Sequence, residues 1–393
     1  MGFNIWTDCP RVPITQLLEF IVDNRGKTVP TAPSGHKLIA TNCVTNNTLF
    51  PLYEKVRYLS DETYRTWFRS HPIPGDILFV NKGTPGRVCM VPDPIDFCIA
   101  QDMIALRADD SKIYNKYLFT VLRSHEIQQQ IYNTNVGDVI PHFKKQFMDQ
   151  LLIPVPDRKV QEAIGDLYYA LSYKVEHNKK INDNLQQQAA ALFANFYDHA
   201  ETEVGFTEII QILGGGTPKT GESSYWNGNV PFFTPKDVGS PYTLSTEKTI
   251  TEEGLAHCNS RLYPVNTVFV TARGTVGKVG LPGVPMAMNQ SCYALVGKET
   301  HQLLVYFYTL KAVDRLKHKA SGAVFDAITT RDFESEILMK LSDEDAQGFL
   351  DVAEPIYQAV LSNSIENLRL AALRDSLLPK LMSGEIDVST VQL

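Results

Sequence analysis

The sequence predicts an α+β protein in which two pseudo-symmetric β-rich domains are separated by two long antiparallel helices that form a coiled coil. Three observations predict this fold. Several sequence patches of the first half recur, in the same order, in the second half. Each half opens with strand-like runs that end in glycine turns, and each half closes with a long run of helical periodicity.

The repeat is visible in three pairs of segments. The run "ITQLLEFIVDNRGKT" from Ile14 is matched by "FTEIIQILGGGTPKT" from Phe206. The run "PGDILFVNKGTPGRVCMV" from Pro74 is matched by "PVNTVFVTARGTVGKVGL" from Pro264, and "AQDMIAL" is then matched by "NQSCYAL". Because the long helical runs follow in the same order, we interpret the chain as a tandem duplication.

The duplication sets the expected domain boundaries. We expect a first β-rich domain over residues 1–156 and a first long helix over residues 157–200. The second copy has a domain over residues 201–341, then a long helix and C-terminal tail over residues 342–393. Within each copy a helical hairpin-like stretch follows the strands, "IYNKYLFTVLRSHEIQQQIYN" in the first and "HQLLVYFYTLKAVDRLKHKA" in the second.

The second long helix has recognisable signals for its start and its end. Ser342 with Asp345 resembles a capping box, although Asp replaces the usual Glu. Pro355 predicts a kink or a late start near that residue. Gly384 is a plausible C-terminal stop.

The two long helices have an obvious way to bury their apolar faces. A helix of about forty residues is roughly 60 Å long, so we expect the two to pack antiparallel as a coiled coil. Asn178 and Asn363 fall at equivalent places, where each is either a polar register marker in the seam or merely solvated. The predicted seam comprises Leu167, Leu171, Val175, Asn178, Leu185, Val352, Ile356, Val360, Asn363 and Leu370.

Composition excludes several protein classes. No run of eighteen or more apolar residues appears, so we expect no membrane span, and the first residues do not read as a secretory signal. The six cysteines form no CxxC pair, which argues against a zinc site and favours free thiols in the cytoplasm. The net charge of −7 taken alone argues against a nucleic-acid partner.

Catalytic motifs are missing from the sequence. There is no G-x-S-x-G elbow, no H-E-x-x-H and no Asn-Pro-Pro-Tyr or Asp-Pro-Pro-Tyr motif of adenine methyltransferases. The loop "FVTARGTVGKVG" resembles a phosphate-binding P-loop, but Ala272 and Val279 stand where Gly and Ser or Thr are needed. We therefore expect neither catalysis nor a bound metal or cofactor in this chain.

The glycine turns are local positive spots in an acidic chain. Neither Ile77–Pro92 nor Pro264–Lys298 contains an acidic residue, while both contain Lys and Arg. Such turns either approach DNA phosphates or are plain hairpin turns. The candidate DNA-binding residues are Arg25, Lys27, Thr28, Asn81, Lys82, Thr84, Arg87, Gln101, Thr217, Lys219, Thr220, Tyr225, Trp226, Lys236, Arg273, Thr275, Lys278, Asn289 and Gln290.

Together these segments resemble a known family. The order "LGGGTPKT", "YWNGNVPFFTPKDV", "VFVTARGTVGKVGL" and "MNQSCYAL", followed by a long helix ending "LRDSLLPKLMSGEI", resembles the specificity subunit of type I restriction-modification systems. The resemblance covers nearly the whole chain and is strongest from Phe206 to Ile386. In the first half "DNRGKT" replaces "GGGTPKT" and no Tyr-Trp pair follows, as expected if the two domains read different sequences.

The resemblance implies a function. Each β-rich domain would be a target-recognition domain for one half of a split, asymmetric double-stranded DNA sequence. The long helices would be spacers that also dock two methyltransferase subunits, which carry S-adenosylmethionine, while separate restriction motor-nuclease subunits, which use Mg-ATP, would cleave DNA. The alternative is a duplicated scaffold or carbohydrate-binding protein with no DNA role.

Overall fold

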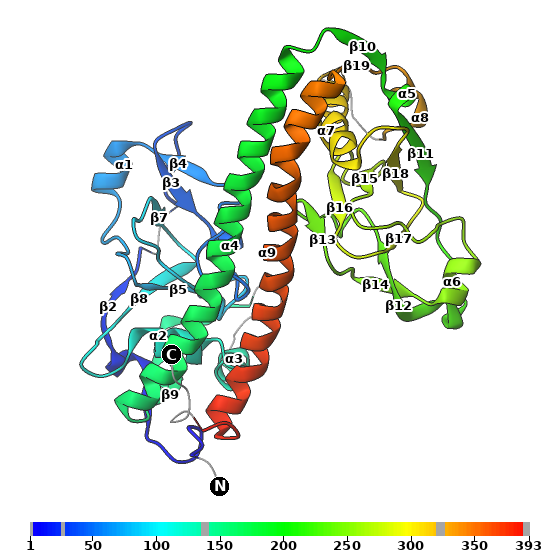
Figure 1. Cartoon of the computed structure of the whole chain (residues 1–393). Coiled ribbons are helices and arrows are strands. Elements are labelled where there is room, and N and C mark those ends of the chain that lie inside the picture. The colour runs from blue at the N-terminus through cyan, green and yellow to red at the C-terminus, as the bar shows by residue number, and fades with distance from the viewer. Residues whose placement is uncertain (1–2, 25–27, 135–140, 320–326, 388–393) are drawn as a thin grey trace. The chain divides into compact units, whose positions relative to one another are not determined.

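The computed structural model describes residues 3–24, 28–134, 141–319 and 327–387. The chain forms two compact units (Figure 1). Unit 1 comprises Met1–His177 together with Asn367–Leu393, and unit 2 is the continuous segment Asn178–Glu366. The predicted domain boundaries differ from this division, since each unit includes half of each long helix.

Unit 1 contains three small sheets. A four-stranded antiparallel sheet has the order β2–β8–β5–β6, and a three-stranded sheet has the order β4–β3–β7, in which β3 and β7 are parallel. The third sheet pairs β1 with β9. The strands are β1 Arg11–Pro13, β2 Leu18–Val22, β3 His36–Ile39, β4 Arg57–Leu59, β5 Ile77–Val80, β6 Val88–Met90, β7 Phe97–Ile99, β8 Met103–Ala108 and β9 Leu152–Pro154.

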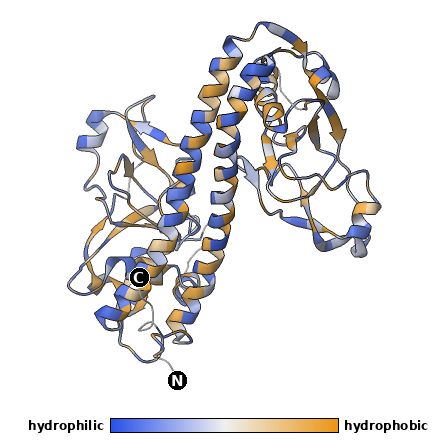
Figure 2. Cartoon of the chain, viewed as in Figure 1, coloured by the Kyte–Doolittle hydropathy of each residue, from blue (hydrophilic) through white to orange (hydrophobic). Residues whose placement is uncertain are grey.

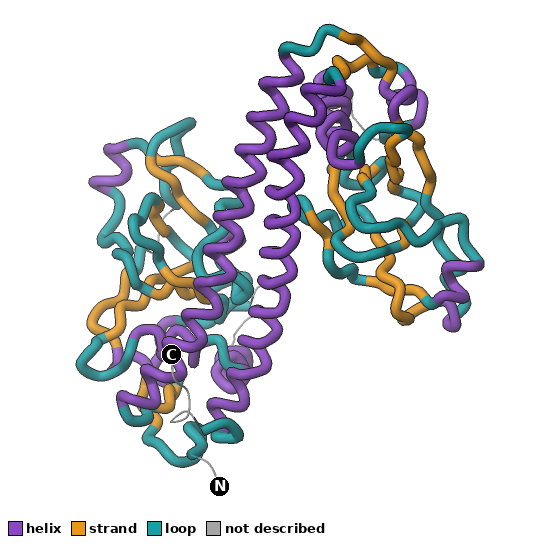
Figure 3. The backbone as a smooth tube through the Cα atoms, in the orientation of Figure 1, coloured by secondary structure: helices purple, strands orange, loops and turns teal. Residues whose placement is uncertain are grey.

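Unit 2 repeats this topology and adds one strand, β13, which pairs with β16. Its sheets have the orders β11–β18–β15–β16–β13, β14–β12–β17 and β10–β19, and β12 is parallel to β17 just as β3 is to β7. The strands are β10 Thr202–Gly205, β11 Ile210–Gly214, β12 Trp226–Phe233, β13 Tyr242–Thr243, β14 Lys248–Ile250, β15 Val268–Thr271, β16 Val279–Pro282, β17 Ala287–Met288, β18 Cys292–Gly297 and β19 Ile337–Lys340. Loops join these short strands (Figure 3). The shared topology agrees with the predicted duplication.

The shorter helices differ between the copies. In unit 1 the helical stretch breaks into α2 and α3, because Ser124 caps α3 by accepting the Ile127 N–H. In unit 2 it is the single helix α7, so the expected hairpin-like form is wrong there; Leu310, Lys311 and Ala312 continue the helix and offer no cap. The short α-helices are α1 Asp61–Thr66, α2 Asn115–Leu122, α3 His125–Asn133, α5 Phe206–Ile209, α6 Glu252–Ala256, α7 Gln302–Lys319 and α8 Thr330–Glu334. The 3₁₀ helices are η1 Ile14–Leu17, η2 Thr41–Cys43, η3 Lys145–Gln150 and η4 Ser223–Tyr225.

The two long helices are α4, Arg158–Asp198, and α9, Asp343–Ser383. The Ser342 hydroxyl accepts the Asp345 N–H at 3.1 Å and caps α9 as predicted. The helix begins well before Pro355, so the expected late start is wrong. It ends at Ser383, where Gly384 has φ 73°, the left-handed conformation of a C-terminal stop.

Each unit builds its core around parts of both long helices. In unit 1, Ile164 and Tyr168 of α4 share a core with Leu378, Leu381 and Met382 of α9. The Ile5 N–H also donates to the Met382 carbonyl at 3.0 Å, which ties the N-terminal segment to the end of α9.

In unit 2 the core combines Phe193 of α4 with Phe349 and Tyr357 of α9 and Phe307 of α7. The Phe193 ring lies 4.9 Å from that of Phe307 and 5.4 Å from that of Phe349. Hydrophobic residues are interleaved with hydrophilic ones along both long helices (Figure 2), as expected for helices buried on one side only.

The predicted seam is partly placed by the structure. Val175 and Val360 are buried. Val352 is 50 % exposed, so its assignment to the seam is wrong. The buried face passes instead through Phe349 and Ala353, which shifts the inward positions by one residue. Leu167, Leu171, Leu185, Ile356 and Leu370 are half-buried.

Both predicted seam asparagines make contacts between α4 and α9. Asn178 is 1 % exposed, and its Nδ2 donates to Glu366 Oε2 at 2.7 Å. Asn363 is half-buried and donates to Asn182 Oδ1 at 2.8 Å, while Asn182 Nδ2 donates to the Val360 carbonyl at 3.2 Å. These bonds join amides and a carboxylate from two helices, as a polar register layer does, rather than leaving the asparagines merely solvated.

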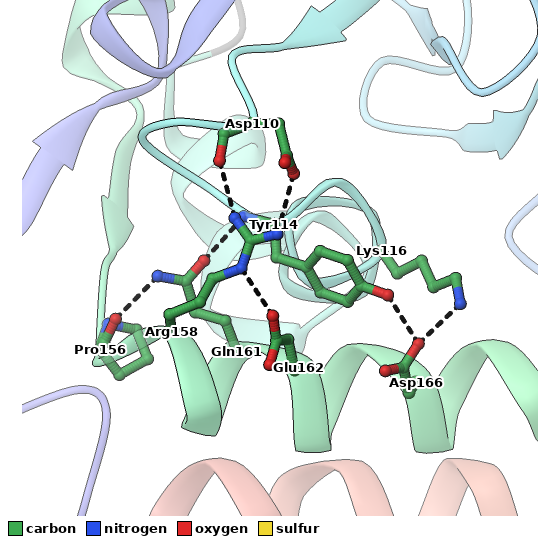
Figure 4. Close-up of polar contacts among 8 residues, drawn as sticks. All are labelled: Asp110, Tyr114, Lys116, Pro156, Arg158, Gln161, Glu162 and Asp166. Carbon is green, nitrogen blue, oxygen red and sulfur yellow. Dashed lines mark hydrogen bonds and ion pairs between the residues drawn. The ribbon is translucent and has the colours of Figure 1, made fainter.

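A polar cluster fastens the start of α4 to the β-rich part of unit 1 (Figure 4). The guanidinium of Arg158 donates to the Asp110 carbonyl at 2.7 Å and to its carboxylate at 2.9 Å. It also donates to Glu162, one turn along the helix, at 3.0 Å. The Arg158 guanidinium therefore holds the first turn of α4 against Asp110 through charge-assisted hydrogen bonds.

A second set of bonds follows along α4 (Figure 4). Gln161 accepts the Tyr114 N–H at 2.8 Å, and Asp166 accepts from the Tyr114 hydroxyl at 2.7 Å and from Lys116 at 2.6 Å. Burial acts to raise the pKa of Asp166, but the hydrogen bonds from Lys116 and Tyr114 bring it below its ordinary value. Asp166 thus stays charged in the fold.

Two findings bear on the broad class of protein. None of the helices in the described residues has the length and apolar composition needed to cross a membrane. All six cysteines are free thiols; Cys43, Cys89, Cys98 and Cys292 are buried, and Cys9 and Cys258 are half-buried.

Candidate nucleic-acid interface

The two glycine turns have the same backbone conformation. In unit 1 the Gly86 N–H donates to the Val80 carbonyl at 2.9 Å, and in unit 2 the Gly277 N–H donates to the Thr271 carbonyl at 2.8 Å. The φ angles are 87° at Gly83, 88° at Gly86, 84° at Gly274 and 72° at Gly277. Each turn joins two antiparallel strands, whereas a P-loop leads into a helix. The turns are therefore hairpin turns, whose exposed rims carry Lys and Arg.

A groove lies beside the turn of unit 1. It is lined by four predicted residues, Thr28, Asn81, Lys82 and Gln101, and by Asp23, Arg69, Asp102 and His142. The groove contains both signs of charge: Lys82 Nζ lies 3.8 Å from Asp102 Oδ1, and Lys145 Nζ lies 3.2 Å from Asp23 Oδ2. Asn81 is buried, whereas Arg69 and Lys82 are exposed. This mixture of amides, hydroxyls and cations suits contacts with both bases and phosphates.

A second groove lies at the corresponding turn of unit 2. It is lined by Thr234, Pro235, Lys236, Glu247, Lys248, Gly274, Thr275 and Asn289. Of these, Lys236, Thr275 and Asn289 were predicted from the sequence. Thr275 donates to the Pro235 carbonyl at 3.1 Å, which fixes the turn against the opposite wall. Lys236 lies 3.8 Å from Glu247, an exposed pair that contributes little to stability.

Other predicted residues of unit 2 make contacts with one another or with Lys248 and His257. Trp226 Nε1 donates to the Lys219 carbonyl at 3.3 Å, and Lys248 lies over the Trp226 ring at 5.8 Å. Tyr225 is stacked on His257 at 5.0 Å. The side chains of Thr217 and Gln290 are hydrogen-bonded to each other, and Thr220 is exposed.

The remaining predicted residues do not line these two grooves. Thr84 and Arg87 lie on the turn of unit 1, and Arg273 and Lys278 on that of unit 2; Arg87, Arg273 and Lys278 are exposed. Lys278 lines a separate depression with Val238, Gly239 and Lys317. Arg25 and Lys27 lie outside the described residues.

Sequence reasoning missed Arg69, His142 and Lys248. Each lies outside the repeated motifs and reaches its groove only because the fold brings the loop after α1, the segment before β9 or strand β14 to that place. The signal available in the sequence was the lack of an acidic neighbour in "WFRSHP" around Arg69.

The chain is similar to proteins of one family. The family model for the type I restriction modification DNA specificity domain matches residues 30–187 and again residues 202–340. The type I restriction enzyme HindI specificity subunit of Haemophilus influenzae is 22% identical over 398 residues, covering 79% of this chain and 86% of that protein. The MjaIX specificity subunit of Methanocaldococcus jannaschii is 31% identical over 124 residues, or 30% of this chain and 29% of its own length.

A solved structure supports the fold. The S subunit of a type I restriction-modification system from M. genitalium aligns with a TM-score of 0.57 at 15% identity, covering 94% of this chain and 95% of that one. Two matches to the family model, one in each half of the chain, agree with the duplicated sheets. The chain therefore belongs to the type I restriction-modification DNA specificity family, as a non-catalytic DNA-recognition subunit that carries two copies of the family's domain.

Proposed function

We propose that the chain reads a bipartite, asymmetric DNA sequence, with unit 1 binding one half and unit 2 the other. The observation that carries this proposal is that each unit has its own groove beside its glycine turn, the turn after β5 in unit 1 and after β15 in unit 2. The residues that line the two grooves differ, so the two half-sites would differ in sequence.

The predicted residues divide into two roles. Exposed cations on the turns, namely Arg87, Arg273 and Lys278, contact phosphates, which sets register and affinity. Amides at the grooves, namely Gln101 and Asn289, face base edges, because an amide can pair with adenine in the major groove. Each of the other candidate residues contacts phosphates if it lies on an exposed turn and bases if it lines a groove.

The partners follow from the family. We propose that two methyltransferase subunits dock on α4 and α9, bring S-adenosylmethionine and methylate an adenine in each half-site. Restriction subunits that use Mg-ATP would join the same complex, acting on DNA in the cytoplasm. The continuous helices α4 and α9, which belong in part to both units, would keep the two readers at a fixed spacing.

Reconstitution tests this proposal. The chain is expressed with a candidate adenine methyltransferase subunit from the same genome, and total DNA is sequenced by a method that detects N6-methyladenine. We expect one two-part motif with a constant gap, and no such motif from the methyltransferase alone. A complex that methylates no adenine in any DNA contradicts the proposal and favours a scaffold or carbohydrate-binding role.

A further inference from the structure

Arg69 is a cation at the groove of unit 1 that has no partner among the described residues. It follows α1 in the loop that borders the groove, and it is exposed. Within the described residues its guanidinium makes no hydrogen bond or ion pair, unlike Lys82 and Lys145, which lie near Asp102 and Asp23. An arginine kept free of carboxylates beside polar groove residues is available to a ligand.

A buried asparagine fixes the backbone from which Arg69 projects. Asn24 is 3 % exposed, and its Oδ1 accepts the Arg69 N–H at 2.9 Å and the Ser70 N–H at 3.4 Å. Its Nδ2 donates to the Ser70 carbonyl at 2.8 Å and to the Ile99 carbonyl at 3.3 Å. One amide therefore joins the loop of Arg69 to the segment that leads into Gln101, on the same groove. A pre-positioned side chain loses less conformational freedom when it binds.

Unit 2 has a different arrangement at the same place. Lys27 pairs with Lys219 in the repeat, so Asn24 pairs with Gly216. The Gly216 N–H donates to the Met288 carbonyl at 3.1 Å, and a Cβ on Gly216 would lie 2.6 Å from the backbone nitrogen of Asn259. The loop after α6 thus packs directly on glycine backbone, and the neutral Asn259 follows α6 where Arg69 follows α1.

The uncharged polar side chains of the groove favour a base as the ligand of Arg69. Thr28, Asn81 and Gln101 line the groove with Arg69 and offer hydrogen bonds to base edges, whereas Asp102 and Asp23 already lie near Lys82 and Lys145. The planar guanidinium pairs with guanine O6 and N7 through two parallel hydrogen bonds, which lysine cannot reproduce.

We propose that Arg69 is a specificity-determining residue that reads a guanine in the half-site bound by unit 1, with Asn24 as its positioning residue. This inference rests on the proposed function, because it needs the groove of unit 1 to face DNA. In unit 2 the neutral Asn259 stands where Arg69 stands in unit 1.

The test uses the chain in complex with its methyltransferase partner, and the motif methylated by the wild-type complex is determined first. Arg69→Ala and Arg69→Lys complexes are then assayed on DNA that carries each single base change in the motif. We expect both variants to lose discrimination at one G·C pair of one half-site, by about tenfold or more, with the other half-site unchanged. Arg65→Ala, an exposed arginine on α1 that does not line the groove, is the matched control and should keep the wild-type motif.

Two results overturn the inference. If Arg69→Lys keeps the wild-type motif while Arg69→Ala weakens binding equally to all sequences, Arg69 contacts a phosphate. If both variants keep wild-type discrimination at every position, Arg69 contacts no base. A wild-type complex that methylates nothing is a separate outcome, which refutes the proposed function and this inference with it.

Discussion

Unit 1 and unit 2 have the same backbone hydrogen bond at the residue that precedes each glycine turn. The Phe143 N–H donates to the Asn81 carbonyl at 2.8 Å, and the Ile328 N–H donates to the Ala272 carbonyl at 2.9 Å. The side chains at these equivalent positions differ: unit 1 has the amide of Asn81 where unit 2 has the methyl group of Ala272. The duplicated fold has therefore kept its backbone framework while the groove walls changed.

Asn24 of unit 1 and Gly216 of unit 2 are equivalent positions of the repeat, and they show how much one residue can change the packing of the neighbouring loop. With asparagine, a side chain bridges the strand end and the neighbouring loop. With glycine, the two backbones are in direct contact. Both arrangements are hydrogen-bonded, so the exchange changes how the neighbouring loop is held without opening the core.

Gly216→Ala should lower the free energy of unfolding of unit 2 by about 3 kcal/mol, because the new Cβ would overlap the backbone of Asn259 and Ser260. Urea denaturation followed by tryptophan fluorescence measures it. Gly221→Ala is the control, since a Cβ there meets nothing within 4 Å. Equal stability of the two variants would show that the loop after α6 does not pack on Gly216.

Asn24→Ala should cost about 2 kcal/mol in unit 1, because the partly buried N–H groups of Arg69 and Ser70 lose their acceptor. Hydrogen exchange at these two amides should become faster. Asn47→Ala, at an exposed asparagine whose side chain makes no hydrogen bond within the described residues, should leave both stability and exchange unchanged. Unaltered exchange in Asn24→Ala would refute the bridging role.

Asn182→Ala should destabilise unit 2 by about 1 kcal/mol, since Asn363 then lacks its acceptor between α4 and α9. In unit 1 the contacts between the two helices include Arg374, which lies over the Tyr168 ring at 5.5 Å. Thermal unfolding measures the change, with exposed Asn195→Ala on the same helix as the control. A stabilised Asn182→Ala would mean that the polar layer serves register alone.

Arg87→Ala in unit 1 and Lys278→Ala in unit 2 should have the smallest effect. Each removes one exposed cation, so each should reduce the slope of log affinity against log salt concentration by about 1. Filter binding of the complex to its own site, at several salt concentrations, measures the slope. The free energy of unfolding should not change. A slope equal to wild type in both variants would make these turns structural only.

Local patterns were sufficient to predict much of the architecture. The motifs around Gly83 and Gly274 revealed the duplication, and spacing by three and four residues revealed both long helices. The same spacing misplaced Val352, because a repeat of three and four fits two neighbouring faces of a helix until a partner selects one. Here Phe349 and Ala353 occupy the inward face.

Local sequence patterns do not predict all of the groove residues. Asn24 is bonded to Arg69, Ser70 and Ile99, which are distant from it in sequence, and no periodicity reports such bonds. Lys82 and Thr275 were found because they lie on the repeated turns. Arg69 was missed because its importance depends on the loop that a buried amide holds in place.

Unit 1 cannot complete its core until α9 has been made, because Leu378, Leu381 and Met382 are part of that core. Unit 2 is one uninterrupted stretch of chain, Asn178–Glu366. During synthesis on the ribosome, the unit encoded second therefore has all its residues first. Unit 1, although encoded first, must wait for the end of α9. Substitutions or truncations in the last turns of α9 would therefore destabilise unit 1, which contains Ile5.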